Sequence, residues 1–159
     1  MPAFTGLGAP YWDMEAKGTI TGITRGTTRN DLIRASLESI AYQVYDLLSC
    51  IENDINEPLT FLNVDGGATE NNFLMQFQSD ILNKSIKRPE IIETTALGVA
   101  LLSGLSIGIW ESPEEFKKII KMNRCFAPAL KKEQRDLLLS GWRNSIKMTL
   151  TERKKNAHI

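Results

Sequence analysis

The most regular hydrophobic pattern in the chain predicts a long amphipathic helix over residues 30–53. Thr28 or Asn30 can cap its start, and Asp31 and Glu38 lie toward its positive N-terminal end. The apolar residues recur at alternating spacings of four and three, which places them on one stripe of an α-helix. This stripe consists of Ile33, Leu37, Ile40, Val44, Leu47 and Ile51.

Three segments have the pattern of strands. Residues 19–24 alternate polar and β-branched apolar side chains, which predicts a strand with one wet face. Residues 59–64 form a short apolar run after the helix-ending Asn56-Glu57-Pro58, and their length favours a strand buried on most of its surface. Residues 85–88, before Pro89, are the third candidate.

Further helices follow each of the later strands. One has Thr69 as its expected N-cap and Asn83 as its stop. In the next, residues 95–107, small side chains recur every four residues, so we expect burial on more than one side; they are Ala96, Ala100 and Gly104.

The C-terminal part of the chain predicts two more helices. Ser112-Pro113 starts a short one that reaches about Ile120. After an extended stretch at residues 124–128, a last helix begins near Lys132 and carries four residues inward; they are Leu138, Trp142, Ile146 and Leu150.

Strands alternating with helices indicate an α/β domain with a mainly parallel sheet. We expect residues 1–150 to form one domain and residues 151–159 to be a frayed polar tail. In such sheets, ligands bind beyond the carboxyl ends of the strands.

Composition narrows the classes of function. The 159 residues carry 19 basic and 19 acidic side chains, a balance that gives no case for nucleic acid or an anionic membrane as a partner. No stretch approaches the roughly 20 apolar residues of a membrane span. Cys50 and Cys125 are too far apart for a zinc-ligand spacing, and we expect both to be core residues of a reduced, cytoplasmic protein.

The turn Asp65-Gly66-Gly67-Ala68-Thr69-Glu70-Asn71-Asn72 is the best candidate for a binding site. Two glycines after a strand remove the Cβ atoms that would keep a ligand from the main chain, and the next helix offers free N–H groups. A phosphate, or the sugar and base of a nucleotide, would fit there. The pattern is neither a Walker A sequence nor a G-x-G-x-x-G fingerprint, so by itself it favours an ordinary tight turn whose glycines adopt φ > 0 over a ligand site.

No catalytic set can be assembled from the sequence. Asp65 is more typical of a turn acid than of a base or metal ligand. His158, the one histidine, lies in the predicted tail, and Trp12, Trp110 and Trp142 are expected to pack. We therefore predict no catalytic residue and no metal site.

Six motifs are spread over nearly the whole chain. They are FTGLGAPYWD (4–13), GITRG (22–26), RASLESIAYQ (34–43), VDGG (64–67), NNFLMQFQSDIL (71–82) and TTALG (94–98). In this order they resemble the FGGY carbohydrate kinases, and among them the glycerol kinases. Gly141-Trp142 fits the last helix of that family, whereas Met14 and Lys17 are mild departures, standing where proline and arginine are usual.

The resemblance implies part of a larger enzyme. Members of the family are about three times this long and consist of two actin-like, ribonuclease-H-like domains that close around ATP, with Mg²⁺, and glycerol. This chain is similar to the later part of the second, nucleotide-side domain. In the family the catalytic base and the glycerol site lie upstream, so glycerol is expected as a partner only of the complete enzyme.

The resemblance also assigns roles within the glycine turn. Gly67 matches the glycine whose backbone approaches the nucleotide, and Asn71 matches the asparagine that contacts its base or ribose side. Gly66 and Ala68 shape the same wall. The cofactor expected from this match is ATP or ADP, bound as the Mg²⁺ complex in the complete enzyme.

Three hypotheses remain open from the sequence. The leading one is the C-terminal part of a glycerol kinase, inactive by itself. The alternatives are a separate nucleotide-binding module and a structural piece that completes a partner carrying the N-terminal portion. In each case a sheet edge and the rings of Phe4, Tyr11 and Trp12 should be uncovered, which favours association with another chain or with itself.

Overall fold

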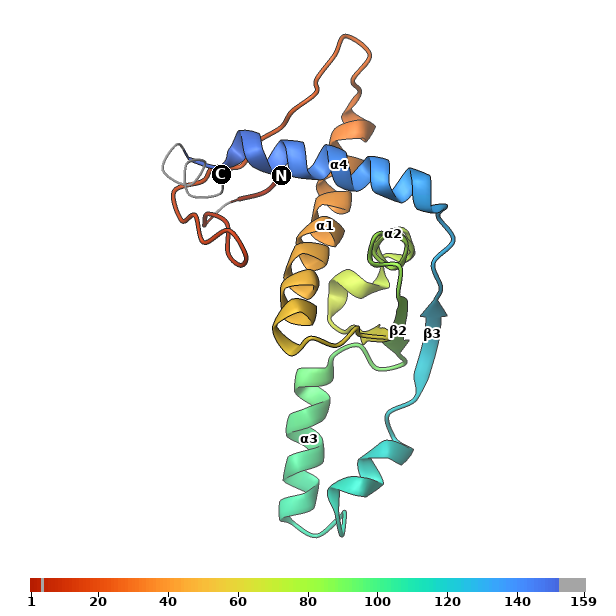
Figure 1. Ribbon diagram of the computed structural model, residues 1–159. Coiled ribbons are helices and arrows are strands. Elements are labelled where there is room, and N and C mark those ends of the chain that lie inside the picture. Colours follow the sequence, from red (N-terminus) through yellow and green to blue (C-terminus); the bar gives the residue numbers. More distant parts are fainter. Residues whose placement is uncertain (4, 152–159) are drawn as a thin grey trace.

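Helices and short strands alternate along the chain in the computed structural model, which describes residues 1–3 and 5–151 (Figure 1). The predictions made for Phe4, His158 and the tail beyond Thr151 lie outside the described residues. The elements, in chain order, are α1 (Arg29–Ile55), β1 (Phe61–Asn63), the 3₁₀ helix η1 (Gly67–Glu70), α2 (Asn72–Leu82), β2 (Ser85–Pro89), α3 (Thr94–Ser106), the 3₁₀ helix η2 (Pro113–Lys118), β3 (Met122–Phe126) and α4 (Lys132–Thr149).

A small mixed sheet with the strand order β1-β2-β3 forms the centre of this α/β fold. β1 and β2 are parallel, with Phe61 opposite Ser85, whereas β2 and β3 are antiparallel, with Ile86 opposite Phe126. The expected parallel pairing therefore holds for one of the two strand pairs. β1 lies at an edge, and Phe61 is 42% exposed, so the expectation of a mostly buried strand was wrong.

α1 confirms the predicted helix but not its predicted core face. The Thr28 hydroxyl oxygen accepts from the Asp31 N–H, and the Asp31 carboxylate accepts from the Thr28 N–H, forming a capping box. The buried face carries Tyr42 and Leu48 instead, because this is the side against which α2 and α4 pack. The predicted stripe is largely exposed; we use "apolar stripe of α1" for Ile33, Ile40, Leu47 and Ile51.

α2 lies at the centre of the core. The ring of Tyr42 stacks on that of Trp142, with centroids 5.0 Å apart, and meets the ring of Phe77 of α2 edge-on. Asn83, with φ 53°, ends the helix as predicted, but its N-cap is Asn71 rather than Thr69. The main buried apolar residues are Ala41, Leu74, Met75, Phe77, Ile81, Leu82, Ile86, Phe126, Leu139, Trp142 and Ile146.

α4 crosses α1 in Figure 1 and buries Trp142, Ile146 and the following Leu150, as predicted. Leu139 replaces Leu138 as the most buried leucine, since Leu138 is only partly covered.

Asp46 of α1 ties α4 and the N-terminal loop together. Its Oδ2 atom accepts from the Trp142 indole N–H at 2.7 Å and from the Tyr11 hydroxyl at 2.9 Å. We call this set the Asp46 clasp.

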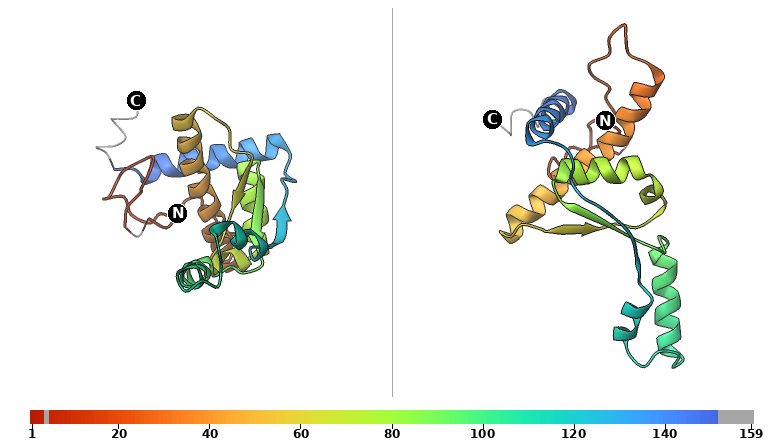
Figure 2. Two further views of the ribbon diagram at one scale, coloured as in Figure 1. Left: turned by 90° about the horizontal axis from the view of Figure 1, so that it is seen from below. Right: turned by 90° about the vertical axis from the view of Figure 1, so that its right-hand side faces the viewer.

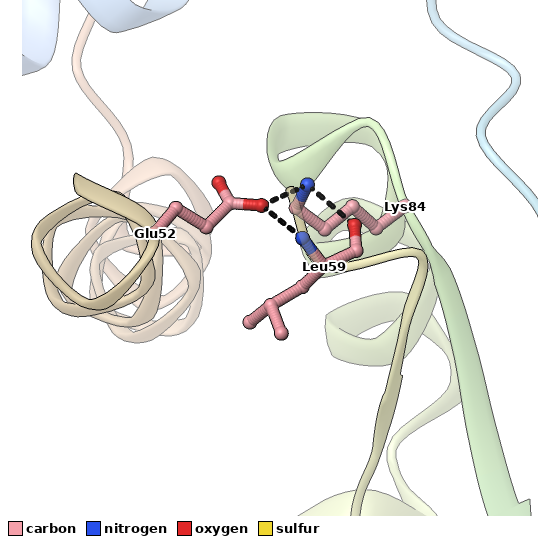
Figure 3. Close-up of polar contacts among 3 residues, drawn as sticks. All are labelled: Glu52, Leu59 and Lys84. Atoms are coloured by element: carbon pink, nitrogen blue, oxygen red, sulfur yellow. Dashed lines mark hydrogen bonds and ion pairs between the residues drawn. The ribbon is translucent and has the colours of Figure 1, made fainter. Parts of the chain in front are cut away.

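A second polar contact fixes the end of α1 against the sheet (Figure 3). The Glu52 carboxylate accepts from the Leu59 N–H at 2.6 Å and pairs with the Lys84 ammonium at 2.7 Å. The ammonium also donates to the Leu59 carbonyl at 2.8 Å. The start of β1 is thereby fixed both to α1 and to the connection between α2 and β2.

Residues 19–24 do not form the predicted strand. Ile20 and Ile23 are exposed, and no described strand lies alongside them to complete a ladder. An alternating pattern needs such a partner before it can become a strand.

α3 and η2 form an arm that projects from the other helices (Figures 1 and 2). Only Leu101 and Gly104 of α3 are buried, so burial on more than one side was a wrong prediction. The absence of a side chain at Gly104 instead leaves room for the indole ring of Trp110, because a Cβ at position 104 would lie 2.6 Å from the indole nitrogen.

Trp12 is 65% exposed, which contradicts the expectation that it packs but agrees with the expectation, from the resemblance, that its ring is uncovered; Tyr11 is half-buried. The prediction that the cysteines are core residues was wrong, since Cys50 is half-buried and Cys125 exposed. Within the described residues, none of the helices is both long and apolar enough to span a membrane.

Candidate functional site

The candidate site is the connection between β1 and α2, residues 65–71, which we call the glycine turn. Gly66 has φ 81° and ψ 164°, a backbone conformation that side chains disfavour. Its N–H donates to the Ile92 carbonyl at 2.8 Å, and its carbonyl accepts from the Thr69 N–H and hydroxyl. Gly66 therefore bends the chain away from β1, and Thr69 holds the bend from the buried side.

The next two residues leave their main chain open. Gly67 and Ala68 are exposed, and a Cβ added at Gly67 would have no atom within 4 Å. Within the described part of the chain, the N–H groups of both residues have no hydrogen-bond acceptor. This surface suits a ligand that brings acceptor oxygens or a flat ring close to the backbone.

Asn71 has two distinct polar groups. Its Oδ1 atom accepts from the Leu74 N–H at 3.1 Å and so caps α2. Its side-chain amide donates to no described residue, and Asn71 is exposed. One end of the side chain is therefore used by the fold, whereas the other is available to a ligand.

Two residues to which the sequence assigned no role in the turn support it. The Thr94 hydroxyl, at the start of α3, donates to the Asp65 carboxylate, which agrees with Asp65 being a structural turn acid. Arg88 of β2 donates to the carbonyls of Thr69 and Glu70. The TTALG motif includes Thr94, but neither contact could be predicted from the sequence, because both depend on how later elements fold back on the turn.

A cavity of about 270 Å³ lies next to the turn, between the sheet, α3 and residues 119–121, which follow η2. Asp65 lines it with Asn63, Thr94, Leu97 and Met122, but the four candidate residues Gly66, Gly67, Ala68 and Asn71 do not. Of these four, Gly67, Ala68 and Asn71 are exposed and Gly66 is half-buried.

The described residues contain no cluster of three or more histidine, cysteine, aspartate or glutamate side chains that could hold a metal ion. The glycine turn offers backbone and amide donors, and the acid beside it is bonded to Thr94. Such an arrangement offers hydrogen-bond donors to the acceptor oxygens of a ligand.

The chain is similar in sequence to a known family of proteins. Residues 1–107 match the model of the FGGY family of carbohydrate kinases, C-terminal domain. The chain belongs to this family. The glycine turn lies inside the matched segment.

Curated FGGY relatives extend the match beyond residue 107. The chain is 51% identical over 149 residues to a glycerol kinase of Ligilactobacillus salivarius and 53% identical over 150 residues to one of Desulfitobacterium hafniense. Each alignment covers 94% of this chain and 30% of the relative. The chain thus spans about three tenths of the length of these glycerol kinases.

Solved structures agree with the FGGY fold. The glycerol kinase of Plasmodium falciparum, determined with ADP, superposes with a TM-score of 0.83 at 36% identity, covering 95% of this chain and 30% of that one. A ligand-bound xylulose kinase of Lactobacillus acidophilus gives a TM-score of 0.71 at 24% identity, with 91% and 30% covered, which supports the fold alone. The predicted architecture, part of an FGGY kinase C-terminal domain, is confirmed.

Proposed function

We propose that this chain forms the C-terminal part of a glycerol kinase and supplies one wall of its adenine-nucleotide site. The complete enzyme would transfer the γ-phosphoryl group of ATP to glycerol and release glycerol 3-phosphate. The observation that carries the proposal is the open glycine turn, in a chain about half identical to glycerol kinases and similar in structure to one determined with ADP.

In this proposal Gly66 sets the bend, Gly67 and Ala68 present backbone N–H groups, and the Asn71 amide donates to the base or ribose side of the nucleotide. The catalytic base and the glycerol site belong to the part of the kinase that this chain does not span. Mg²⁺ would neutralise charge on the transferred phosphoryl group.

Calorimetry with ADP tests whether the glycine turn binds the nucleotide. Because Asn71 also caps α2, the variant chosen must keep the cap and remove only the amide donor. Serine at position 71 can still cap α2 but lacks the amide donor, so Asn71→Ser should weaken ADP binding several-fold, the effect of one lost hydrogen bond. Thr28→Ala, which removes the N-cap of α1 far from the turn, is the matched control and should leave ADP binding unchanged. Equal ADP affinity of Asn71→Ser and the parent chain would contradict the assignment of Asn71.

Kinase activity tests the larger proposal. The chain should show no glycerol-dependent ATP turnover alone. It should gain turnover when mixed with the N-terminal seven tenths of the Desulfitobacterium hafniense relative. Turnover by the chain alone would contradict the absence of a catalytic group, and no turnover or ADP binding by the mixture would refute the proposed kinase role.

A second candidate function, docking onto another polypeptide, is favoured by the uncovered apolar surface. The apolar stripe of α1 is exposed, and β1 leaves one side of the sheet unpaired among the described strands. Ile40 and Leu47 of this stripe line a hollow together with Tyr11. Such surfaces pair readily with another chain, either an N-terminal kinase portion or a second copy.

A further inference from the structure

Arg88 joins β2 to the back of the glycine turn. Its Nη1 atom donates to the Thr69 carbonyl at 2.7 Å, to the Asn72 side-chain oxygen at 3.1 Å and to the Glu70 carbonyl at 3.4 Å. The second terminal nitrogen reaches the Asn123 side-chain oxygen of β3 at 3.5 Å. One half-buried guanidinium therefore contacts the residues on both sides of Asn71.

These contacts supply donors to backbone carbonyls that lack a partner within a helix. η1 ends at Glu70 and α2 begins at Asn72, so the last carbonyls of η1 have no partner within a helix. A guanidinium holds several acceptors in a fixed, planar arrangement, and hydrogen bonds from a charged donor are stronger than those between neutral groups. Arg88 thus fixes the junction at which Asn71 lies.

The Arg88 side chain is itself held in place. Its guanidinium carbon lies 5.5 Å from the centre of the Phe126 ring, and Phe126 is buried at the end of β3. Arg124 of β3 lies over the same ring at 4.8 Å, yet none of its hydrogen bonds in the described part of the chain reaches the glycine turn. Both arginines therefore contact the Phe126 ring, but only Arg88 also contacts the glycine turn, so Arg124 can serve as a control for the ring contact.

We propose that Arg88 is a positioning residue for nucleotide binding: its guanidinium holds Thr69, Glu70 and Asn72 so that the Asn71 amide and the N–H groups of Gly67 and Ala68 are fixed for the ligand. The inference rests on the proposed function of the turn. Arg88 does not itself touch the nucleotide in this proposal, and its effect passes through the backbone of η1.

Amide hydrogen exchange on the full chain without ligand tests the claim that Arg88 fixes the backbone around Asn71. Arg88→Met should speed exchange of the Asn71 and Leu74 amides about tenfold or more, the effect of losing a hydrogen bond to a charged donor. Arg88→Lys keeps the charge but not the planar fork and should give a smaller increase. The matched control Arg124→Met should leave these amides unchanged. Unchanged exchange in Arg88→Met would overturn the inference.

ADP affinity tests the claim that this fixing of the turn strengthens nucleotide binding. ADP should bind Arg88→Met at least about tenfold more weakly and Arg124→Met as the parent chain does. In the reconstituted kinase mixture, KM for ATP should rise in Arg88→Met while its kcat changes little, a split that a general loss of folded protein would not produce. Faster exchange with unchanged ADP affinity would overturn the positioning role.

The two experiments distinguish failure of this inference from failure of the proposed function. Exchange needs no ligand, so it reports on Arg88 whatever the turn binds. If the parent chain binds no ADP, alone or in the mixture, the proposed function fails and the positioning role falls with it, even where Arg88→Met loosens the turn.

Discussion

Gly66 and Gly67 are adjacent but are glycines for different reasons. Gly66 has φ 81°, so a side chain there is strained although the space around it is open. Gly67 does not have a positive φ, and nothing lies within 4 Å of a Cβ added to it. The fold therefore requires glycine at position 66, whereas only a ligand would require it at position 67.

This difference gives a matched pair of alanine variants. Gly67→Ala should change the free energy of unfolding little but place a methyl group on the proposed nucleotide surface and weaken ADP binding. Gly66→Ala should lower the free energy of unfolding by about 1 kcal/mol or more through backbone strain. Urea denaturation and calorimetry with ADP measure the two effects. Gly67→Ala with parental ADP affinity would count against close approach of the nucleotide at that residue.

The sequence was sufficient to select the glycine turn, because paired glycines after a strand are a local signal. It was not sufficient to predict how the turn is held. The contact between Arg88 and Thr69 spans 19 residues of chain and exists only because β2 lies alongside η1. The cap was misplaced for a related reason: Thr69 has the right chemistry for an N-cap, but its hydroxyl bonds to Gly66, and η1 delays the start of α2 to Asn72.

The Asp46 clasp connects three separate segments through a single carboxylate. Burial raises the Asp46 pKa, and the hydrogen bonds from Trp142 and Tyr11, together with the charge of Arg143, oppose this rise only in part. Because the pKa is higher in the folded state, Asp46 stabilises the fold while it is protonated, below its unfolded pKa of about 3.9. That contribution is lost as pH rises through the folded pKa.

Substitution of Asp46 tests this pH dependence. The amide introduced by Asp46→Asn keeps an acceptor oxygen but cannot ionise, so the stability of this variant relative to the parent should increase from about pH 4 toward neutral pH. Asp46→Leu leaves the Tyr11 hydroxyl and the Trp142 indole N–H without an acceptor and should lower the free energy of unfolding by about 1–3 kcal/mol. Urea denaturation between about pH 4 and 7.5 measures both variants across the range where the carboxylate ionises. A pH-independent difference for Asp46→Asn would show that the carboxylate is not buried as described.

The bounds of the helices could be predicted from the local sequence pattern, but the face of each helix that is covered by other elements could not. The bounds of α1 are within about two residues of the prediction, since capping and periodicity are local properties of the chain. Which face of a helix is covered depends on what packs against it, and periodicity does not contain that information. The apolar stripe of α1, residues 19–24 and α3 all have patterns typical of buried elements, yet all three are largely uncovered.

Those uncovered elements have a common explanation if the chain works as part of a larger kinase. The curated relatives are more than three times as long as the matched segment, and the rest of such a protein would supply the missing contacts. The uncovered apolar surface should then bind an N-terminal kinase portion, or a second copy of the chain in its absence.

Charge placed on the apolar stripe of α1 tests this expectation. Ile40→Glu with Leu47→Glu should abolish association, because a buried unpaired carboxylate is strongly disfavoured, while helix content by circular dichroism stays unchanged. Leu137→Glu, at an exposed leucine of α4, is the control and should leave association intact. Sedimentation velocity, with and without the N-terminal portion of the Desulfitobacterium hafniense relative, provides the measurement. A parent chain that stays monomeric in both conditions would contradict the docking proposal.

The divided side chain of Asn71 has a consequence for evolution. Serine and aspartate cap a helix as well as asparagine does, and threonine somewhat less well, so the fold alone permits drift among these residues. Binding through the side-chain amide permits only asparagine. In gene copies under selection for kinase activity, position 71 should therefore stay invariant, whereas copies that have lost the nucleotide should exchange Asn71 for other capping residues while keeping Gly66.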